Sequence, residues 1–303
     1  MMATNVGSPV TTLQDLLRHV YILPRRITLE TSSRWAEVPR LRGVWGAALH
    51  DLDPQAYAKV FHPEGHGKLP GYVLRPIIPS PAERPSFDFI LLGEAADYSE
   101  PAMRAWDIAG ARGIGPVDAN TGDRDPFFVR ERYVLDRNTR VAEVDYPWSV
   151  DKIGWSRGDP MVDSCRLDFL TPVGLFHKKR LIEAPTMTDI VAKGCRRIGS
   201  LLPEYVQPEW TEVKAELIAY AKTLSNLQWQ GTTVAVKRYS ARQHNDFAVP
   251  GVYGSLGPFV PGILWPILNT LSWVHLGKST NIGMGWLSFS GVGLRQRTSV
   301  EDA

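Results

Sequence analysis

The chain has 303 residues, 44% hydrophobic and 22% charged, which is typical of a globular protein with about two domains of ~150 residues each. Its formal net charge is only +2, so any affinity for nucleic acid has to come from local basic patches. Two cysteines without a CxxC spacing, no signal-peptide pattern and a longest apolar stretch broken by prolines argue against a zinc ribbon, a secreted disulfide scaffold and a membrane protein, and predict a cytoplasmic one.

The first half of the chain alternates strands and helices. Strands are expected at 25–33, 72–79, 86–95 and 126–135. Helices are expected at 40–52, 54–61 and 101–110. Asp53 can cap the second of these helices, with Pro54 at its first position, and the strand at 86–95 places Phe87, Phe89 and Leu91 on one face.

The second half repeats this order. Strands are expected at 165–176, 229–243 and 285–294, and a strand or turn at 250–259. Helices are expected at 186–202, 209–224 and 261–274.

Each half therefore ends in a helix, a glycine-rich stretch and a strand. The repeat is weak as sequence but consistent in order, between "RAWDIAGARGIGP" (104–116) and "LNTLSWVHLGKSTNIGMGW" (268–286). The pattern predicts an α+β protein of two tandem ferredoxin-like (RRM-like) domains, 1–150 and 151–303, the second carrying a C-terminal glycine-rich loop. The glycine- and proline-rich segment 145–164 is the expected boundary.

The tripeptide Gly277-Lys278-Ser279 looks like the end of a nucleotide-binding P-loop. The spacing rejects that function, because the P-loop needs a glycine where this chain has Ser272, and a strand before the loop and a helix after it. Here a helix comes before and a strand after. What remains is a glycine-rich loop with expected free backbone N–H groups and a Lys and a Ser, which suits phosphates, including those of RNA.

Three stretches resemble the CRISPR-associated endoribonucleases that cut precursor repeat RNA, within the RAMP superfamily. They are "RLRGVWGAALHDLDPQAYAKVF" (40–61), "VKRYSARQHNDFAVPGVYG" (236–254) and "LSWVHLGKSTNIGMGWLSF" (271–289). The basic strand followed by the glycine-rich loop is the most specific part.

The resemblance implies binding of CRISPR repeat RNA and one cut per repeat without a metal or another cofactor. The 2′-OH would attack the adjacent phosphate and leave a 2′,3′-cyclic phosphate, which needs a base, an acid and cations. It also implies that the product crRNA can stay bound, with other CRISPR-associated proteins as partners in an effector complex. Two alternatives remain open: a catalytically silent RNA-binding subunit of such a complex, and a metabolic α+β enzyme.

The same resemblance places the candidate site residues. For catalysis, His62 on its exposed turn is favoured, with Lys68 nearby, and His50 and Arg42 on the first helix are the other candidates. Both a histidine-based and an arginine-based site stay open. The candidate RNA-binding residues are Arg26, Arg40, Lys237, Arg238, Arg242, His244, Lys278, Ser279 and Gly283.

Overall fold

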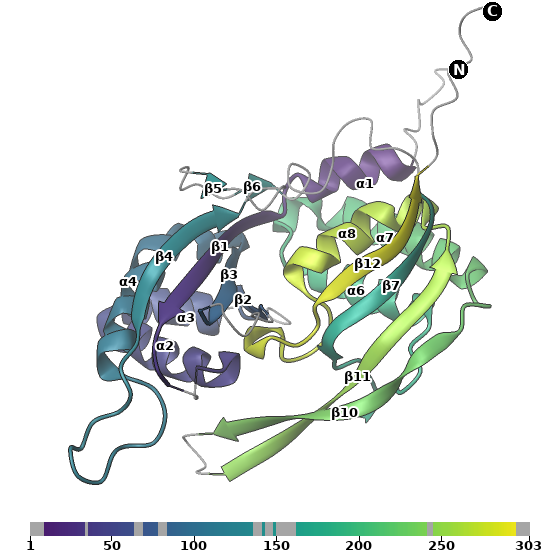
Figure 1. Cartoon of the computed structure of the whole chain (residues 1–303). Helices are drawn as coiled ribbons and strands as arrows, with labels where there is room; N and C mark the ends of the chain where they lie inside the picture. The colour runs from purple at the N-terminus through teal and green to yellow at the C-terminus, as the bar shows by residue number, and fades with distance from the viewer. Residues whose placement is uncertain are drawn as a thin grey trace, which may run out of the picture.

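The computed structural model describes residues 9–33, 36–63, 69–77, 84–135, 141–142, 148–149, 162–240 and 245–294. Two α+β units lie side by side, the N-terminal unit in purple and blue and the C-terminal unit in green and yellow (Figure 1). Most of the predicted boundary segment 145–164 lies outside the described residues.

The N-terminal unit is built on an antiparallel sheet with the order β2-β3-β1-β4. Its main strands are β1 (Tyr21–Glu30), β2 (Tyr72–Pro76), β3 (Ser86–Leu92) and β4 (Phe128–Leu135). Two short strands, β5 (Val141–Ala142) and β6 (Trp148–Ser149), pair with β4 and β1. Its helices are α2 (Val38–Leu52), α3 (Pro54–Phe61), the 3₁₀ helix η1 (Gly93–Tyr98) and α4 (Ser99–Arg112).

The C-terminal unit is built on an antiparallel sheet with the order β10-β11-β7-β12. Its strands are β7 (Val162–Val173), β10 (Trp229–Ser240), β11 (Asn245–Phe259) and β12 (Leu287–Leu294), and β8 (Phe176–His177) pairs with β9 (Arg180–Leu181) in a small separate hairpin. Its helices are α6 (Met187–Gly199), α7 (Gln207–Thr223), α8 (Trp265–Val274) and the 3₁₀ helices η2 (Glu204–Val206), η3 (Gly262–Leu264) and η4 (Thr280–Ile282).

Both sheets have the same topology when their four main strands are renumbered in chain order, namely 2-3-1-4. This order is that of a βαββαβ ferredoxin-like unit. The predicted fold of two tandem ferredoxin-like domains is therefore confirmed. The segment expected to be a strand or turn at 250–259 is part of β11, which forms a long hairpin with β10 that runs beneath the N-terminal unit towards α2 (Figure 1).

Sequence reasoning missed the first helix, α1 (Pro9–Leu17). Leu13, Leu16 and Leu17 are buried at helical spacing, and the helix begins with Pro9 at a position where proline is favoured. Although it is at the start of the chain, α1 packs against α7 and α8 of the C-terminal unit.

The N-terminal sheet is buried on both faces because its apolar residues do not alternate with polar ones. Phe89 and Leu91 face α2 and α4, whereas Ile90 and Leu92 join the hydrophobic core of the C-terminal unit. The two units therefore share one of the two main cores. No helix among the described residues is both long and apolar enough to cross a membrane.

Candidate active site

One face of α2 carries both a cation and an imidazole with small residues between them. Arg42, Gly46 and His50 are spaced by four residues, so they lie on the same side of the helix over two turns, about 12 Å. A Cβ atom on Gly46 would stand 2.7 Å from Cζ of Phe61, so only glycine lets α3 pack this closely. The result is an open cavity of about 300 Å³ with Arg42, His50, Asp51 and Tyr57 in its wall.

An aromatic pair on α3 holds the predicted catalytic residues together. Asp53 caps α3 as expected, its Oδ1 accepting from the Ala56 amide at 2.9 Å, and this cap sets where the helix starts. The rings of Tyr57 and Phe61 stack at 4.6 Å between centroids.

The candidate groups surround this pair from three directions. The His50 and His62 rings contact Tyr57 edge-on, with centroids 5.0 and 5.6 Å away. The Arg42 guanidinium lies 5.0 Å from the centre of the Phe61 ring. The structure therefore brings Arg42, His50 and His62 together, although only the first two are in the wall of the cavity.

His50 has a carboxylate next to it. Its Nδ1 lies 3.3 Å from Oδ1 of Asp51, and Arg112 of α4 donates to the other oxygen, Oδ2, at 2.7 Å. The hydrogen bond from Arg112 is the main reason that the pKa of Asp51 is lowered, followed by that to His50. The Nε2 atom is then the ring nitrogen of His50 that remains for proton transfer.

Arg42 is held from the other side by a buried tyrosine. Its Nε donates to the hydroxyl of Tyr72 on β2 at 3.0 Å. Burial raises the pKa of Tyr72 to about 12, so the hydroxyl keeps its proton at neutral pH. The same hydroxyl is hydrogen-bonded to the side chain of Asn281, which lies in the glycine-rich loop of the other unit.

The glycine-rich loop, residues 275–286, packs against β2 rather than standing free. Gly283 has a φ of 90°, and a Cβ there would meet Pro76 and Leu74 at 3.1 and 3.3 Å. The expectation of free loop amides is wrong for those that donate to carbonyls of the protein, namely the amides of His275, Leu276, Lys278, Ile282, Gly283 and Gly285. The loop is thus a fixed support, and its charge comes from side chains.

An arginine of the N-terminal unit clamps the base of this loop. The Arg75 guanidinium lies 5.0 Å from the rings of both Trp273 and Trp286, which bracket the loop, and its Nε donates to the buried Asp88 at 2.7 Å. Arg26 donates to the same carboxylate at 2.8 Å. Arg26, which the sequence predicts to contact RNA, is thus part of an ion-paired group away from the α2 cavity.

Most of the other predicted RNA-binding residues lie in the described part of the chain. Lys237 and Lys278 are exposed, and Ser279 and Gly283 belong to the loop described above. Arg40 is half-buried in the first turn of α2. Arg242 and His244 lie outside the described residues, as does the catalytic candidate Lys68, while Arg238 is described only as part of strand β10.

Lys237 stands at a groove between the two units. The groove has a volume of about 480 Å³ and runs between the first turn of α2, Pro76 and Met284. Its wall is otherwise largely apolar, so Lys237 supplies a cation beside a surface suited to ribose or base contacts.

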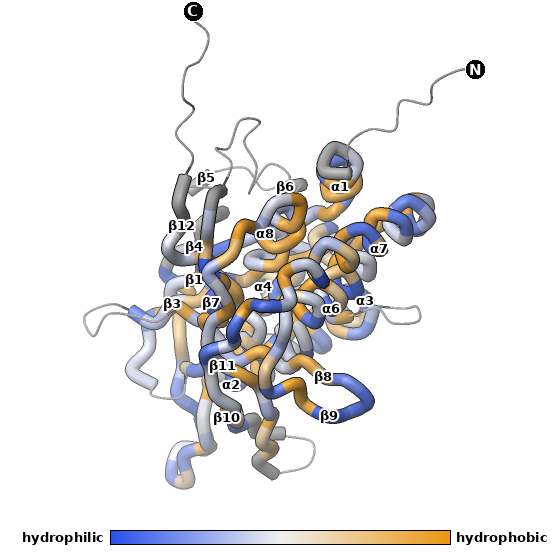
Figure 2. The backbone as a smooth tube through the Cα atoms, turned by 90° about the vertical axis from the view of Figure 1, so that its right-hand side faces the viewer, coloured by the Kyte–Doolittle hydropathy of each residue, from blue (hydrophilic) through white to orange (hydrophobic). Residues whose placement is uncertain are grey.

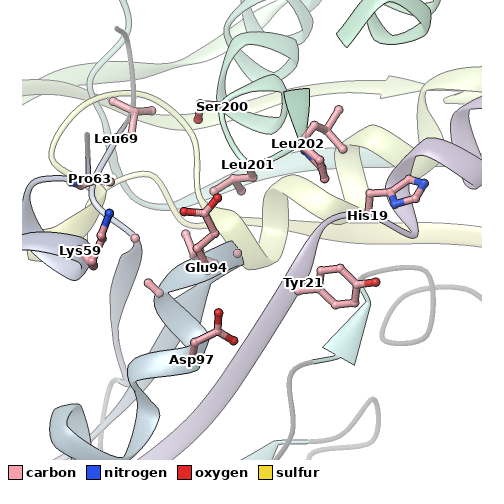
Figure 3. A pocket seen from close by; sticks show the side chains of 15 residues that line it. His19, Tyr21, Lys59, Pro63, Leu69, Glu94, Asp97, Ser200, Leu201 and Leu202 are labelled. Carbon is pink, nitrogen blue, oxygen red and sulfur yellow. The ribbon is translucent and has the colours of Figure 1, made fainter. Parts of the chain in front are cut away.

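A further cavity of about 470 Å³ opens on another side of α3 (Figure 3). Lys59 and His19 are in its wall, together with the carboxylates of Glu94 and Asp97. Two carboxylates at the rim disfavour a polyanion, so this cavity is a poorer candidate for RNA than the face of α2.

A family model described as CRISPR-associated endoribonuclease Cas6 matches residues 167–287. This part of the chain is similar to the Cas6 family. The assignment to the CRISPR repeat-processing endoribonucleases, and with it the enzyme class, is confirmed by this match.

Solved Cas6 structures share the fold of this chain over 89% of its length. A Cas6 product complex aligns with a TM-score of 0.59 at 14% identity, covering 89% of this chain and 99% of the other. Cas6 from Thermus thermophilus aligns with a TM-score of 0.54 at 14% identity, covering 89% and 98%. A further Cas6 product complex gives 0.53 at 16% identity, covering 89% and 99%. None of the curated proteins matches the sequence.

The Cas6 match begins in β7 and ends at the start of β12, so it includes Lys237, Lys278 and the glycine-rich loop. The α2 cavity lies outside it. Sequence reasoning missed Tyr57, Tyr72 and Asn281, which hold the cavity together. Tyr57 could have been found from its helical spacing to Phe61, but the contact of Tyr72 with Asn281 joins two units and has no local signal.

Proposed function

We propose that the chain is a metal-independent endoribonuclease that binds CRISPR repeat RNA and cuts precursor crRNA, leaving a 2′,3′-cyclic phosphate. The observation that carries the proposal is the cavity on α2, where Arg42 and His50 share one wall and the glycine-rich loop of the Cas6-matching part is joined to Arg42 through Tyr72. Binding and cleavage elements thus meet at one place.

The side chains present can supply each chemical need of the reaction. His50, in the cavity wall, and His62, on the other edge of Tyr57, are the acid–base candidates for deprotonating the 2′-OH and protonating the leaving 5′-oxygen. Arg42 would neutralise the charge that develops on the phosphorane. Lys68 stays a candidate through its place just after His62 in the sequence.

RNA binding is proposed to extend from this cavity onto the C-terminal unit. Lys237 at the groove and Lys278 in the loop are exposed cations, and Arg238, Arg242 and His244 follow Lys237 along the same basic segment. We expect the cleaved crRNA to remain bound there and to carry the protein into a complex with other CRISPR-associated proteins.

The test is single-turnover cleavage of repeat RNA in EDTA, with product ends analysed by mass. We expect one cut, a cyclic phosphate end and no cut when the 2′-OH at that position is replaced by hydrogen. His50→Ala and His62→Ala should each slow cleavage by roughly 10²–10⁴, typical for a lost acid or base, and leave RNA affinity nearly unchanged.

Other outcomes identify other functions. Normal cleavage by both histidine variants, together with loss in Arg42→Ala, would show an arginine-based site. Tight RNA binding without cleavage by the unaltered protein would make it a silent RNA-binding subunit. Absence of RNA binding would favour a metabolic enzyme.

A further inference from the structure

The β8–β9 hairpin carries a compact positive charge that plays no part in the candidate active site. His177, Lys178, Lys179 and Arg180 are consecutive at its tip, and all four are exposed. Between Asp168 and Asp189 the sequence has a single acid, Glu183. The tip, drawn in blue between β8 and β9, projects from a hydrophobic base (Figure 2). We call residues 177–180 the basic finger.

The turn of the basic finger has two lysines at backbone positions that favour asparagine and glycine. Lys178 and Lys179 have φ values of 45° and 68°, so both central residues of this two-residue hairpin turn are left-handed. Such type I′ turns favour Asn-Gly, because other residues are strained at positive φ. Two lysines at these positions indicate a role for the charge and not for turn stability.

The cations of the basic finger also have no ion-pair partner among the described residues. In the part of the chain that the structure describes, no carboxylate forms an ion pair with Lys178, Lys179 or Arg180. His177 and Arg180 are cross-strand partners, which gathers the four side chains at one end of the hairpin. A site with this much uncompensated charge attracts a polyanion.

The base of the basic finger is fixed to the glycine-rich loop. Nζ of Lys278 lies 4.7 Å from the centre of the Phe176 ring, and the Lys278 amide donates to the Gly174 carbonyl at 3.0 Å. Three residues beyond Lys278, Asn281 bonds to Tyr72, which holds Arg42. The finger, Lys278 and the cavity on α2 are therefore joined by a continuous set of contacts.

We propose that the basic finger binds the sugar–phosphate backbone of the repeat RNA, beyond the nucleotides at the cavity. This inference rests on the proposed RNA-binding function. The ammonium groups of Lys178 and Lys179 and the guanidinium of Arg180 suit phosphate oxygens, and they do not form a hydrogen-bonding pattern that selects one base. The basic finger therefore adds affinity and fixes the path of the RNA without reading its sequence. Its link to Lys278 favours RNA over an acidic protein as the occupant.

The test replaces the two turn residues with the pair that this turn conformation favours. Lys178→Asn/Lys179→Gly removes two charges while supplying the Asn-Gly pair typical of type I′ turns, so the folded protein should be as stable as before or more so. Binding is measured by titration of repeat RNA with a 2′-deoxy cut site, from low to moderate salt. The controls are Lys178→Arg/Lys179→Arg, which keeps the charge, and Arg104→Gln/Lys222→Asn, which removes two exposed cations from α4 and α7.

We expect the Asn-Gly variant to bind repeat RNA about tenfold more weakly, which corresponds to the loss of roughly 1–2 phosphate contacts. Both controls should have an affinity close to that of the unaltered protein. For the Asn-Gly variant, the plot of log K against log salt should be shallower by roughly 0.7–0.9 for each lost contact. Affinity and slope equal to those of the unaltered protein would overturn the proposal. If the unaltered protein bound no repeat RNA, the proposed function would fail and this inference with it, which is a different result.

Discussion

Tyr72 connects a residue of the glycine-rich loop to a candidate catalytic group. Its hydroxyl accepts from Arg42 and bonds to Asn281, and burial keeps it protonated. A buried phenol with two fixed partners holds the guanidinium in one orientation, which a phosphate clamp requires.

Removing only this hydroxyl should therefore slow cleavage more than it weakens binding. Tyr72→Phe keeps the buried ring, and we expect a single-turnover rate roughly ten times lower with little change in RNA affinity, in line with one lost hydrogen bond to a charged group. In a double-mutant cycle, the change should have no further effect once Arg42 is alanine. Equal effects with and without Arg42 would show that Tyr72 acts elsewhere; Tyr98→Phe is the control.

His275, at the end of α8, makes stability depend on pH. It is fully buried, its Nδ1 bonds to the Met284 carbonyl at 2.9 Å, and burial is the main reason that its pKa is lowered to about 3. The unfolded chain takes up a proton near pH 6.5, whereas the folded protein does not until about pH 3. The stabilisation is therefore complete above pH 6.5 and is lost as the pH falls.

The free energy of unfolding should fall by about 1.4 kcal/mol for each pH unit below 6.5. Urea unfolding at pH 7, 6 and 5 measures it. The dependence of the free energy of unfolding on pH should become smaller in His275→Asn. It should stay unchanged in His177→Asn, where the side chain is exposed. A slope that His275→Asn leaves intact would assign the acid sensitivity to other groups.

Among the helices and strands, those with a local pattern were predictable. Spacing by four residues places Arg42 and His50 on one face of α2, and Asp53-Pro54 marks the start of α3, because both signals come from the nearest neighbours. Helix α1 was missed because it is short and its apolar stripe has only Leu13, Leu16 and Leu17. The free amides expected of the glycine-rich loop are instead bonded to distant carbonyls such as those of Gly174 and Pro172, which no local pattern reveals.

Helix α1 contributes to stability out of proportion to its length. Leu17 is fully buried in the core that the two units share, so Leu17→Ala leaves a cavity there. We expect a loss of about 2–5 kcal/mol in the free energy of unfolding, measured in urea. Gln14→Ala on the same helix, where the side chain is only half-buried, is the control, and equal small losses from both would mean that α1 packs loosely.

Between the two units, the clamp made by Arg75, Trp273, Trp286 and Asp88 holds together segments that are distant in the chain. The clamp fixes the base of the glycine-rich loop to β2, and the loop in turn presents Asn281 to Tyr72. None of these pairings could be predicted from sequence, because their partners are far apart in the chain and their match is one of shape and charge.

Breaking the clamp should destabilise both units at once. Arg75→Met keeps much of the side-chain volume but leaves buried Asp88 with only Arg26, and removal of one partner from a buried ion pair costs about 3–5 kcal/mol. Calorimetry should show a single transition at a lower temperature. Two separate transitions in the unaltered protein would contradict the shared core, and Arg104→Met, at an exposed site on α4, should leave the transition in place.

The packing of α1 on the C-terminal unit also has a consequence for how the protein is made. Leu13 and Leu17 leave the ribosome long before their core partners, which include Leu264, Leu268 and Leu276. At ~5–20 residues per second, the apolar side of α1 waits on the order of 10 to 50 seconds for these partners to be synthesised. The nascent chain therefore exposes a long-lived apolar segment to chaperones until these core partners have been synthesised.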